Sequence, residues 1–240
     1  MKKLLIPVFM LLSFNIYAQV WKSVKGNGNL KNETRQLSEF TSLSVHGAMD
    51  VQIDFGTSNT IKVEADENLL PYVETIVNNG QLIIQPKNNV NLKSRSKIVV
   101  HVSMTKINGL QLSGSGNING TGPFTNSDQT EISVSGSGNI KLNSVSFDAL
   151  VLNISGSGNI HINGGTANSV KTSISGSGNI DCSKVVCESA EAKISGSGNA
   201  SVNTNKSLDA RISGSGNVYY KGNPTNISTK VAGSGKAIKM

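Results

Sequence analysis

A five-residue motif, Ser-Gly-Ser-Gly-Asn, recurs through the second half of this chain at a nearly fixed interval. Six identical copies and one degenerate copy, Ala-Gly-Ser-Gly-Lys, begin 22, 20, 20, 20, 18 and 19 residues apart. The copies begin at Ser113, Ser135, Ser155, Ser175, Ser195, Ser213 and Ala232. A fixed period of this length indicates a stack of similar units, each of which contacts mainly its neighbours in sequence.

Around each motif, apolar and polar residues alternate with a period of two, which predicts strands rather than helices. Between Val170 and Cys182, every second residue is apolar, threonine or glycine, and the residues between them are polar. Two glycines inside a strand usually mark a bend or a close backbone approach. We therefore expect each Gly-Ser-Gly segment to form the corner of a coil, with the flanking isoleucines packed inside.

One unit alone buries too little apolar surface to offset the backbone entropy lost on folding, whereas stacked units share ladder hydrogen bonds and a continuous core. No stretch between motifs has the length and apolar spacing of a helix. Isoleucine, valine and leucine recur in register, which a flexible Gly/Ser linker would not require. The expected fold class is all-β, a parallel β-helix (β-solenoid) with about 20 residues per coil.

The first 18 residues have the pattern of a signal peptide. Lys2 and Lys3 precede a short apolar run, and Ala18 ends a small-residue cleavage site before Gln19. We expect cleavage between Ala18 and Gln19 and export of the remaining chain. The run is short for a membrane span, so no transmembrane segment is expected.

Three further regions follow the signal peptide. Residues 19–36 are polar and rich in glycine and asparagine, so we expect a loose leader. Residues 37–109 lack the motif but alternate like strands, and they predict an irregular, strand-rich N-terminal part that caps the solenoid. Residues 110–240 form the repeat β-helix, and the sequence ends soon after the last motif. An open solenoid end exposes unpaired backbone groups, which self-association or a second domain would cover.

Two signals stand out within the N-terminal part. His46–Asp50 looks like a degenerate copy of the motif. Asn79-Gly80 lies between two apolar runs, Val73–Val77 and Gln81–Gln85, and predicts a hairpin turn.

The two cysteines, Cys182 and Cys187, leave two alternatives open. An exported chain enters an oxidising compartment, which permits a disulfide between them. Cys182 also occupies the inward position that Ile162 holds one unit earlier, so buried free thiols are equally compatible with the pattern.

Charge and composition disfavour several functions. The formal net charge of +7 is scattered and aromatic residues make up 5% of the chain, so nucleic-acid binding is not expected. The acidic residues of the repeats form no recurring pair, and the three histidines are far apart. We therefore expect no catalytic residues, no metal site and no cofactor, and we expect that the protein is not an enzyme.

In-register coils would instead produce ladders of identical polar residues, spaced by about 4.8 Å. Such ladders permit a structural interpretation, in which small residues allow the turn and amides bond along the stack. They also permit a functional one, a hydroxyl- and amide-bearing face for a ligand. The candidate ligand-facing residues are Ser155, Ser157, Asn159, Ser175, Ser177, Asn179, Ser195, Ser197 and Asn199.

The order of a strand-rich opening, Glu67–Leu70, an Asn-Gly hairpin and repeated Ser-Gly-Ser-Gly-Asn coils resembles the head GIN domain family of auto-transporter adhesins, common in Bacteroidetes. The resemblance covers roughly residues 38–236 and implies a right-handed β-helix, a cell-envelope address and an adhesin role. It supplies no catalytic or ligand residues, and this chain has no recognisable translocator segment.

The leading hypothesis is a non-enzymatic, exported cell-envelope protein that binds glycans or other envelope proteins. Its address would be the periplasm, the outer-membrane surface or the extracellular space. The alternative is a purely structural envelope solenoid, and the third hypothesis is a polysaccharide-active enzyme.

Overall fold

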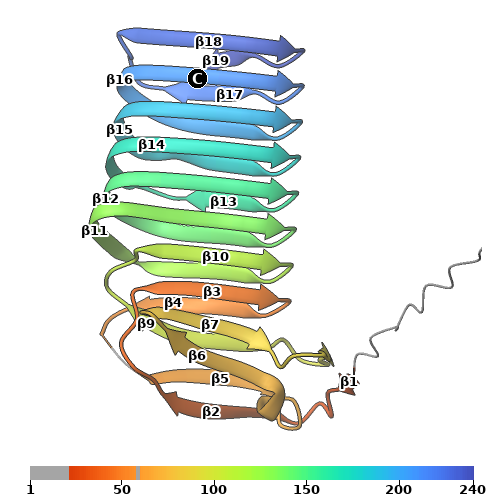
Figure 1. Ribbon diagram of the computed structural model, residues 1–240. Helices are drawn as coiled ribbons and strands as arrows, with labels where there is room; N and C mark the ends of the chain where they lie inside the picture. The colour runs from red at the N-terminus through yellow and green to blue at the C-terminus, as the bar shows by residue number, and fades with distance from the viewer. Residues whose placement is uncertain (1–21, 58–59) are drawn as a thin grey trace, which may run out of the picture.

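The computed structural model describes residues 22–57 and 60–240, which form a tall stack of strands (Figure 1). In the repeat region, every strand pairs in parallel with the equivalent strand of an adjacent coil, so the expected all-β parallel solenoid is confirmed. Each coil turns tightly at one edge of the stack and bends smoothly at the other (Figure 1). The repeat strands are β10 (Gly109–Gly114), β11 (Asn117–Gly136), β12 (Asn139–Gly156), β13 (Asn159–Ile162), β14 (Gly165–Gly176), β15 (Asn179–Gly196), β16 (Asn199–Gly214), β17 (Val218–Lys221), β18 (Asn226–Gly233) and β19 (Ala237–Lys239).

The Gly-Ser-Gly segment forms the tight turn, as the sequence predicts. Gly176 ends β14 with a φ of 123°, a left-handed value that favours glycine. The backbone N–H of Ser177 then donates to the carbonyl oxygen of Gly156, one coil earlier, over 2.9 Å. Each turn is therefore bonded to the turn before it, and the period of the motif becomes the period of the stack.

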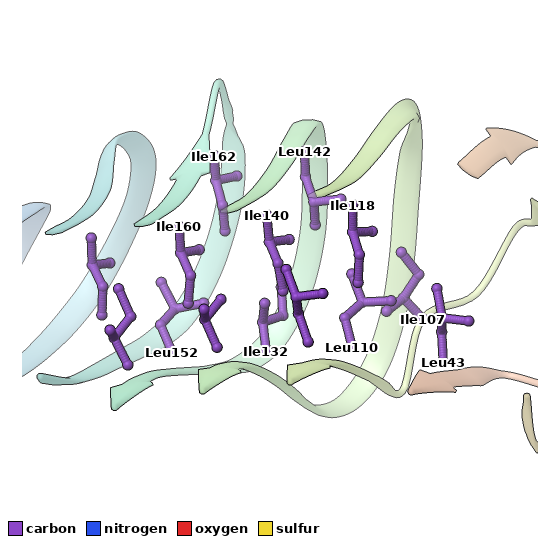
Figure 2. Close-up of a cluster of buried hydrophobic side chains, with 14 of the residues drawn as sticks. Leu43, Ile107, Leu110, Ile118, Ile132, Ile140, Leu142, Leu152, Ile160 and Ile162 are labelled. Atoms are coloured by element: carbon purple, nitrogen blue, oxygen red, sulfur yellow. The ribbon is translucent and has the colours of Figure 1, made fainter. Parts of the chain in front are cut away.

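The core lies between the two strand layers of each coil. Figure 2 shows isoleucine and leucine side chains meeting there from opposite layers, with Ile140 and Ile160 facing Ile132 and Leu152. All four are at most 1% exposed. Because the inward residue of one coil stacks on the inward residue of the next, the core runs continuously along the stack.

The N-terminal part extends the stack below β10. In β3 (Ser42–Gly47), His46 pairs with Ser113 and Gly47 with Gly114, so the segment from His46 to Asp50 takes the place of a motif. β4 (Asp50–Phe55) pairs with β11 and with β9 (Val99–Met104), both in parallel.

The predicted hairpin is confirmed. β6 (Val73–Asn78) and β7 (Gln81–Pro86) pair antiparallel around Asn79 and Gly80, whose φ values are 49° and 73°. Positive φ at both central residues is typical of a type I′ turn.

Antiparallel strands close the N-terminal end of the stack. β2 (Leu30–Gln36) pairs with β5 (Thr60–Asp66), and β5 pairs with β9. A single 3₁₀ turn (Leu70–Tyr72) connects β5 to β6.

The expectation of a loose leader over residues 19–36 is wrong for the described part of that range. β1 (Lys22–Lys25) pairs in parallel with β8 (Val90–Lys93), and β2 lies on β5. Arg35 holds β2 in place: its guanidinium donates to the carbonyl oxygens of Val73 and Leu70 over 2.6 and 2.9 Å. Hydrogen bonds to the main chain thus order a segment that has no apolar alternation.

The predicted signal peptide and its cleavage site at Ala18 and Gln19 lie outside the described residues. Within the described ranges, no helix has the length and apolarity required to cross a membrane.

Candidate functional site at the coil turns

Two rows of serine side chains line the edge of the stack where the coils turn tightly. In the first row, Ser155 pairs with Ser175 and Ser175 with Ser195 in adjacent strands. All three are exposed. Neighbouring strands lie about 4.8 Å apart, so their hydroxyls repeat at that spacing along the stack.

The second row stands at the centre of each turn. The backbone N–H groups of Ser157, Ser177 and Ser197 each donate over 2.9 Å to a glycine carbonyl oxygen of the preceding coil, which fixes these residues at equivalent positions. Their side chains are also exposed. We call the two rows together the serine rail: Ser155, Ser157, Ser175, Ser177, Ser195 and Ser197.

The hydroxyls of the serine rail have no protein partner among residues 22–57 and 60–240. A serine hydroxyl can donate one hydrogen bond and accept two. The rail therefore offers an ordered row of donors and acceptors to whatever approaches the turn edge.

The asparagines that follow the rail are bonded to one another instead. The Nδ2 atom of Asn179 donates to Oδ1 of Asn159 over 3.0 Å, and Nδ2 of Asn199 donates to Oδ1 of Asn179 over 3.0 Å. Each carbonyl oxygen also accepts the backbone N–H of the following asparagine at 3.2 Å. The asparagine ladder thus ties coil to coil, which supports the structural interpretation for Asn159, Asn179 and Asn199.

The ladder extends beyond the three asparagines predicted from sequence. It begins at Asp50, whose Oδ1 accepts both the side chain and the backbone N–H of Asn117 over 2.8 and 3.0 Å. It ends where Oδ1 of Asn217 accepts the backbone N–H of Lys236 over 3.1 Å. Asp50 occupies the asparagine position of the degenerate motif, so aligning it with the later copies would have found it.

A shallow groove of about 510 Å³ runs beside the rail near the C-terminal end of the stack. Ser175 and Ser195 form one wall, and the column Lys193, Arg211 and Lys230 forms the other. Each basic residue lies two positions before its motif. This column was not predicted from the sequence, although its fixed offset from the motif is visible there.

A second groove, of about 700 Å³, brings together two carboxylates, Glu191 and Asp209. Both carry a basic partner: Glu191 contacts Lys193 at 2.6 Å and Lys171 at 3.3 Å, and Asp209 contacts Arg211 at 2.6 Å. The hydrogen bond from Lys193, with a smaller contribution from Lys171, holds the pKa of Glu191 below its ordinary value. Both carboxylates are therefore ion-pair partners of basic side chains.

The histidines remain separate from one another. His161 Nδ1 lies 3.2 Å from Asp181 Oδ2 on the outer surface, and His46 Nε2 lies 3.1 Å from the Ser44 hydroxyl. In the described ranges, no group of three or more His, Cys, Asp or Glu side chains is arranged to hold a metal ion.

The disulfide between Cys182 and Cys187 is not formed. Both are free and buried, and their Sγ atoms lie 3.2 Å from the carbonyl oxygens of Ser201 and Asn203 in the next coil. Burial raises the pKa of both thiols, most strongly at Cys182. Of the two alternatives left open by the sequence, the structure has the buried thiols, because both side chains fill core positions.

The model of a family described as putative auto-transporter adhesin, head GIN domain, matches residues 39–224 of this chain. No curated protein matches the chain at a significant level.

Solved structures share the fold. A putative adhesin from Bacteroides fragilis is 21% identical and has a TM-score of 0.84 over 90% of this chain and 100% of that one. A putative lipid binding protein from Parabacteroides distasonis is 28% identical, with a TM-score of 0.73 over 91% and 100%. A putative adhesin from Parabacteroides merdae is 28% identical, with a TM-score of 0.70 over 91% and 99%.

Proposed function

Because this chain belongs to the head GIN domain family of putative auto-transporter adhesins, we propose that it is a non-enzymatic, exported adhesion module that binds surface glycans along the serine rail. The observation that carries the proposal is the difference between the serine rail and the asparagine ladder. The asparagine amides bond to one another from coil to coil, whereas the adjacent serine hydroxyls are exposed and lack protein partners in the described part of the chain.

Glycan hydroxyls suit such a surface because each hydroxyl, like a serine side chain, both donates and accepts. Single hydroxyl contacts are weak in water, since each exchanges one hydrogen bond for another. A regular row of serine hydroxyls allows a polymer with a repeating unit to bind through several contacts at once. This raises the overall affinity without stronger individual contacts. The rail therefore favours an extended, repeating ligand over a small molecule.

The carboxylates support the non-enzymatic part of the proposal. A general acid needs a pKa raised towards the working pH. The pKa of Glu191 is lowered instead, and Asp209 beside it is paired with Arg211. The ion pairs of Glu191 with Lys193 and Lys171 favour its charged form, which is poorly suited to protonate a glycosidic oxygen.

Glycan-array binding tests the proposal with the triple variant Ser157→Lys, Ser177→Lys and Ser197→Lys, which places long charged side chains on three successive turns. A matched control, Ser146→Lys, Thr166→Lys and Val186→Lys, makes the same charge change at exposed, in-register positions on the opposite bend. We expect the rail variant to lose binding and the control to retain it. Unchanged binding by a folded rail variant would exclude the rail as the site.

A structural envelope protein is the second candidate, favoured by the asparagine ladder and the continuous core, which stiffen the stack without any ligand. It predicts that the wild-type protein binds no glycan on the array and that a deletion strain has a weakened envelope.

Phospholipid vesicles belong in the same binding experiment, because one relative is named as a putative lipid binding protein. Surface proteolysis of intact cells distinguishes the periplasm from the cell surface.

A further inference from the structure

Three basic side chains form a column beside the serine rail. Lys193 pairs with Arg211 in the adjacent strand, and Arg211 pairs with Lys230 in the strand that follows. Neighbouring strands lie about 4.8 Å apart, so three positive charges repeat at that spacing. We call Lys193, Arg211 and Lys230 the basic column. Because like charges directly opposite one another in a sheet are destabilising, the repeated charge is unfavourable for the fold.

The same position carries uncharged residues in the earlier coils. In order along the stack, the residues before Lys193 are Ser44, Gln111, Ser133, Asn153 and Ser173. Each of them pairs in register with the next one, and the last pairs with Lys193. A neutral polar side chain is therefore sufficient at this position, and the fold does not require a cation there.

Two carboxylates accompany the column without covering it. Lys193 Nζ lies 2.6 Å from Glu191 Oε1, and Arg211 Nη2 lies 2.6 Å from Asp209 Oδ2. Alternate residues of a strand point to the same face, so each cation lies between its carboxylate and the serine that begins the motif. The two basic side chains are 41% and 50% exposed, and their carboxylates are 30% and 33% exposed. A ligand on the rail therefore meets the cations before it meets the carboxylates.

Both cations keep hydrogen-bond donors for a ligand. Among residues 22–57 and 60–240, the side chains of Lys193 and Arg211 each have one polar partner, their own carboxylate. An ammonium group has more than one N–H donor, and a guanidinium group has a planar fork of them that fits two oxygens of an oxyanion. The groove of about 510 Å³ lies between these donors and the serines of the rail.

We propose that this groove binds the acidic groups of an anionic polysaccharide whose chain lies along the serine rail. The inference rests on the proposed function, because the rail holds the chain, and it adds the class of glycan. Carboxylate or sulfate groups lie in the groove and accept hydrogen bonds from Lys193 and Arg211. The serine hydroxyls bond to the neutral hydroxyls of the same chain.

Two pairs of polymers with matched backbones test the proposal on the full chain, by biolayer interferometry at physiological ionic strength. Polygalacturonate is compared with its methyl ester, and dextran sulfate is compared with dextran. We expect at least one acidic polymer to bind about tenfold more tightly than its neutral counterpart, or better. The first pair differs in carboxylates and the second in sulfates, so the pair with the larger difference identifies the acidic group.

A variant of unchanged net charge separates the groove from the general positive charge of the protein. The groove variant removes two ion pairs through the substitutions Glu191→Gln, Lys193→Gln, Asp209→Asn and Arg211→Gln. The control variant removes two ion pairs that do not line the groove, through the substitutions Lys106→Gln, Asp128→Asn, Glu188→Gln and Lys206→Gln. We expect the groove variant to bind the acidic polymer at least about fivefold more weakly, and the control to stay within about twofold of the wild type.

Three results overturn the inference: a wild type that prefers neither acidic polymer, a groove variant that binds them as tightly as the wild type, or an equal loss in the control. Each of these leaves the serine rail to its own test, the lysine variant on the glycan array. A rail variant that retains binding to the neutral glycans of that array contradicts the proposed function instead, so the two failures are distinguishable.

Discussion

A Cβ atom on Gly176 would lie 2.4 Å from the carbonyl oxygen of Gly156 in the preceding coil. That oxygen accepts the backbone N–H of Ser177, so it cannot withdraw without breaking the bond between the two turns. We expect Gly176→Ala to lower the free energy of unfolding by at least about 2 kcal/mol, since it combines a steric clash with an unfavourable φ.

Urea unfolding of Gly176→Ala measures this cost, with Gly164→Ala as the control. A Cβ on Gly164 would meet only the carbonyl oxygen of Asn143 at 3.8 Å, an ordinary contact. Equal stability of the two variants would show that the turns do not depend on the close approach of the glycines.

The asparagine ladder should contribute measurably to stability. Asn179→Ala removes the hydrogen bond to Asn159 and the acceptor for both N–H groups of Asn199. We expect a loss of about 1 kcal/mol in the free energy of unfolding, the usual net value of a hydrogen bond. Asn119→Ala, an outward asparagine on an earlier coil outside the ladder, should cost less than about 0.5 kcal/mol. If the two substitutions cost the same, the ladder does not bind the coils together.

Asp66 should make the N-terminal end sensitive to acid. Burial alone would raise its pKa, but hydrogen bonds from the backbone N–H groups of Arg95 and Ser96 and from the Ser94 hydroxyl hold the pKa below its ordinary value. A carboxyl whose pKa is lowered on folding contributes stability above its unfolded pKa of about 3.9, and this contribution is lost as the pH falls through the folded pKa.

Asp66→Asn should therefore be less stable than the wild type at pH 7, and the difference should shrink below about pH 4. Chemical unfolding of both proteins at pH 7 and pH 3 provides the comparison. A difference that is the same at both pH values would mean that the charge of Asp66 does not hold the segment from Ser94 to Ser96.

The two cysteines should remain reduced and unreactive in the folded protein. Burial raises the pKa of both thiols, so little thiolate is present at pH 8. We expect iodoacetamide to label neither cysteine of the native protein, and both after unfolding in urea without reductant. Labelling that requires a reductant would reveal a disulfide between Cys182 and Cys187.

The repeat region could be predicted from sequence because two patterns agree: the regular spacing of the motif, and the alternation of inward and outward residues around it. Ile154 and Ile174 have the same place relative to their motifs, and both are buried. The degenerate copy from His46 to Asp50 also kept its position in the stack. The local sequence pattern was sufficient to predict this region, because each coil contacts the next one along the chain.

The N-terminal closure could not be predicted in the same way. β2 is mostly polar, and it is held by antiparallel pairing to β5 and by Arg35, whose hydrogen bonds reach residues more than thirty positions away. The serine rail could be predicted only in part. Its residues were named from the repeat, but only the geometry separates the exposed hydroxyl of Ser177 from the bonded amide of Asn179.

Deletion of residues 155–174 tests most directly whether the coil is an interchangeable unit that carries both the core and the rail. It joins Ile154 to Ser175, and because Ile154 pairs with Ile174, the new junction repeats the original Ile-Ser step. Urea unfolding should show a folded, cooperative protein with a smaller m-value, since one coil less is exposed on unfolding. Deletion of residues 155–164 removes half a coil, breaks the register and should cause a severe loss of stability. If the longer deletion unfolds the protein as severely as the shorter one, the solenoid is not built from these units.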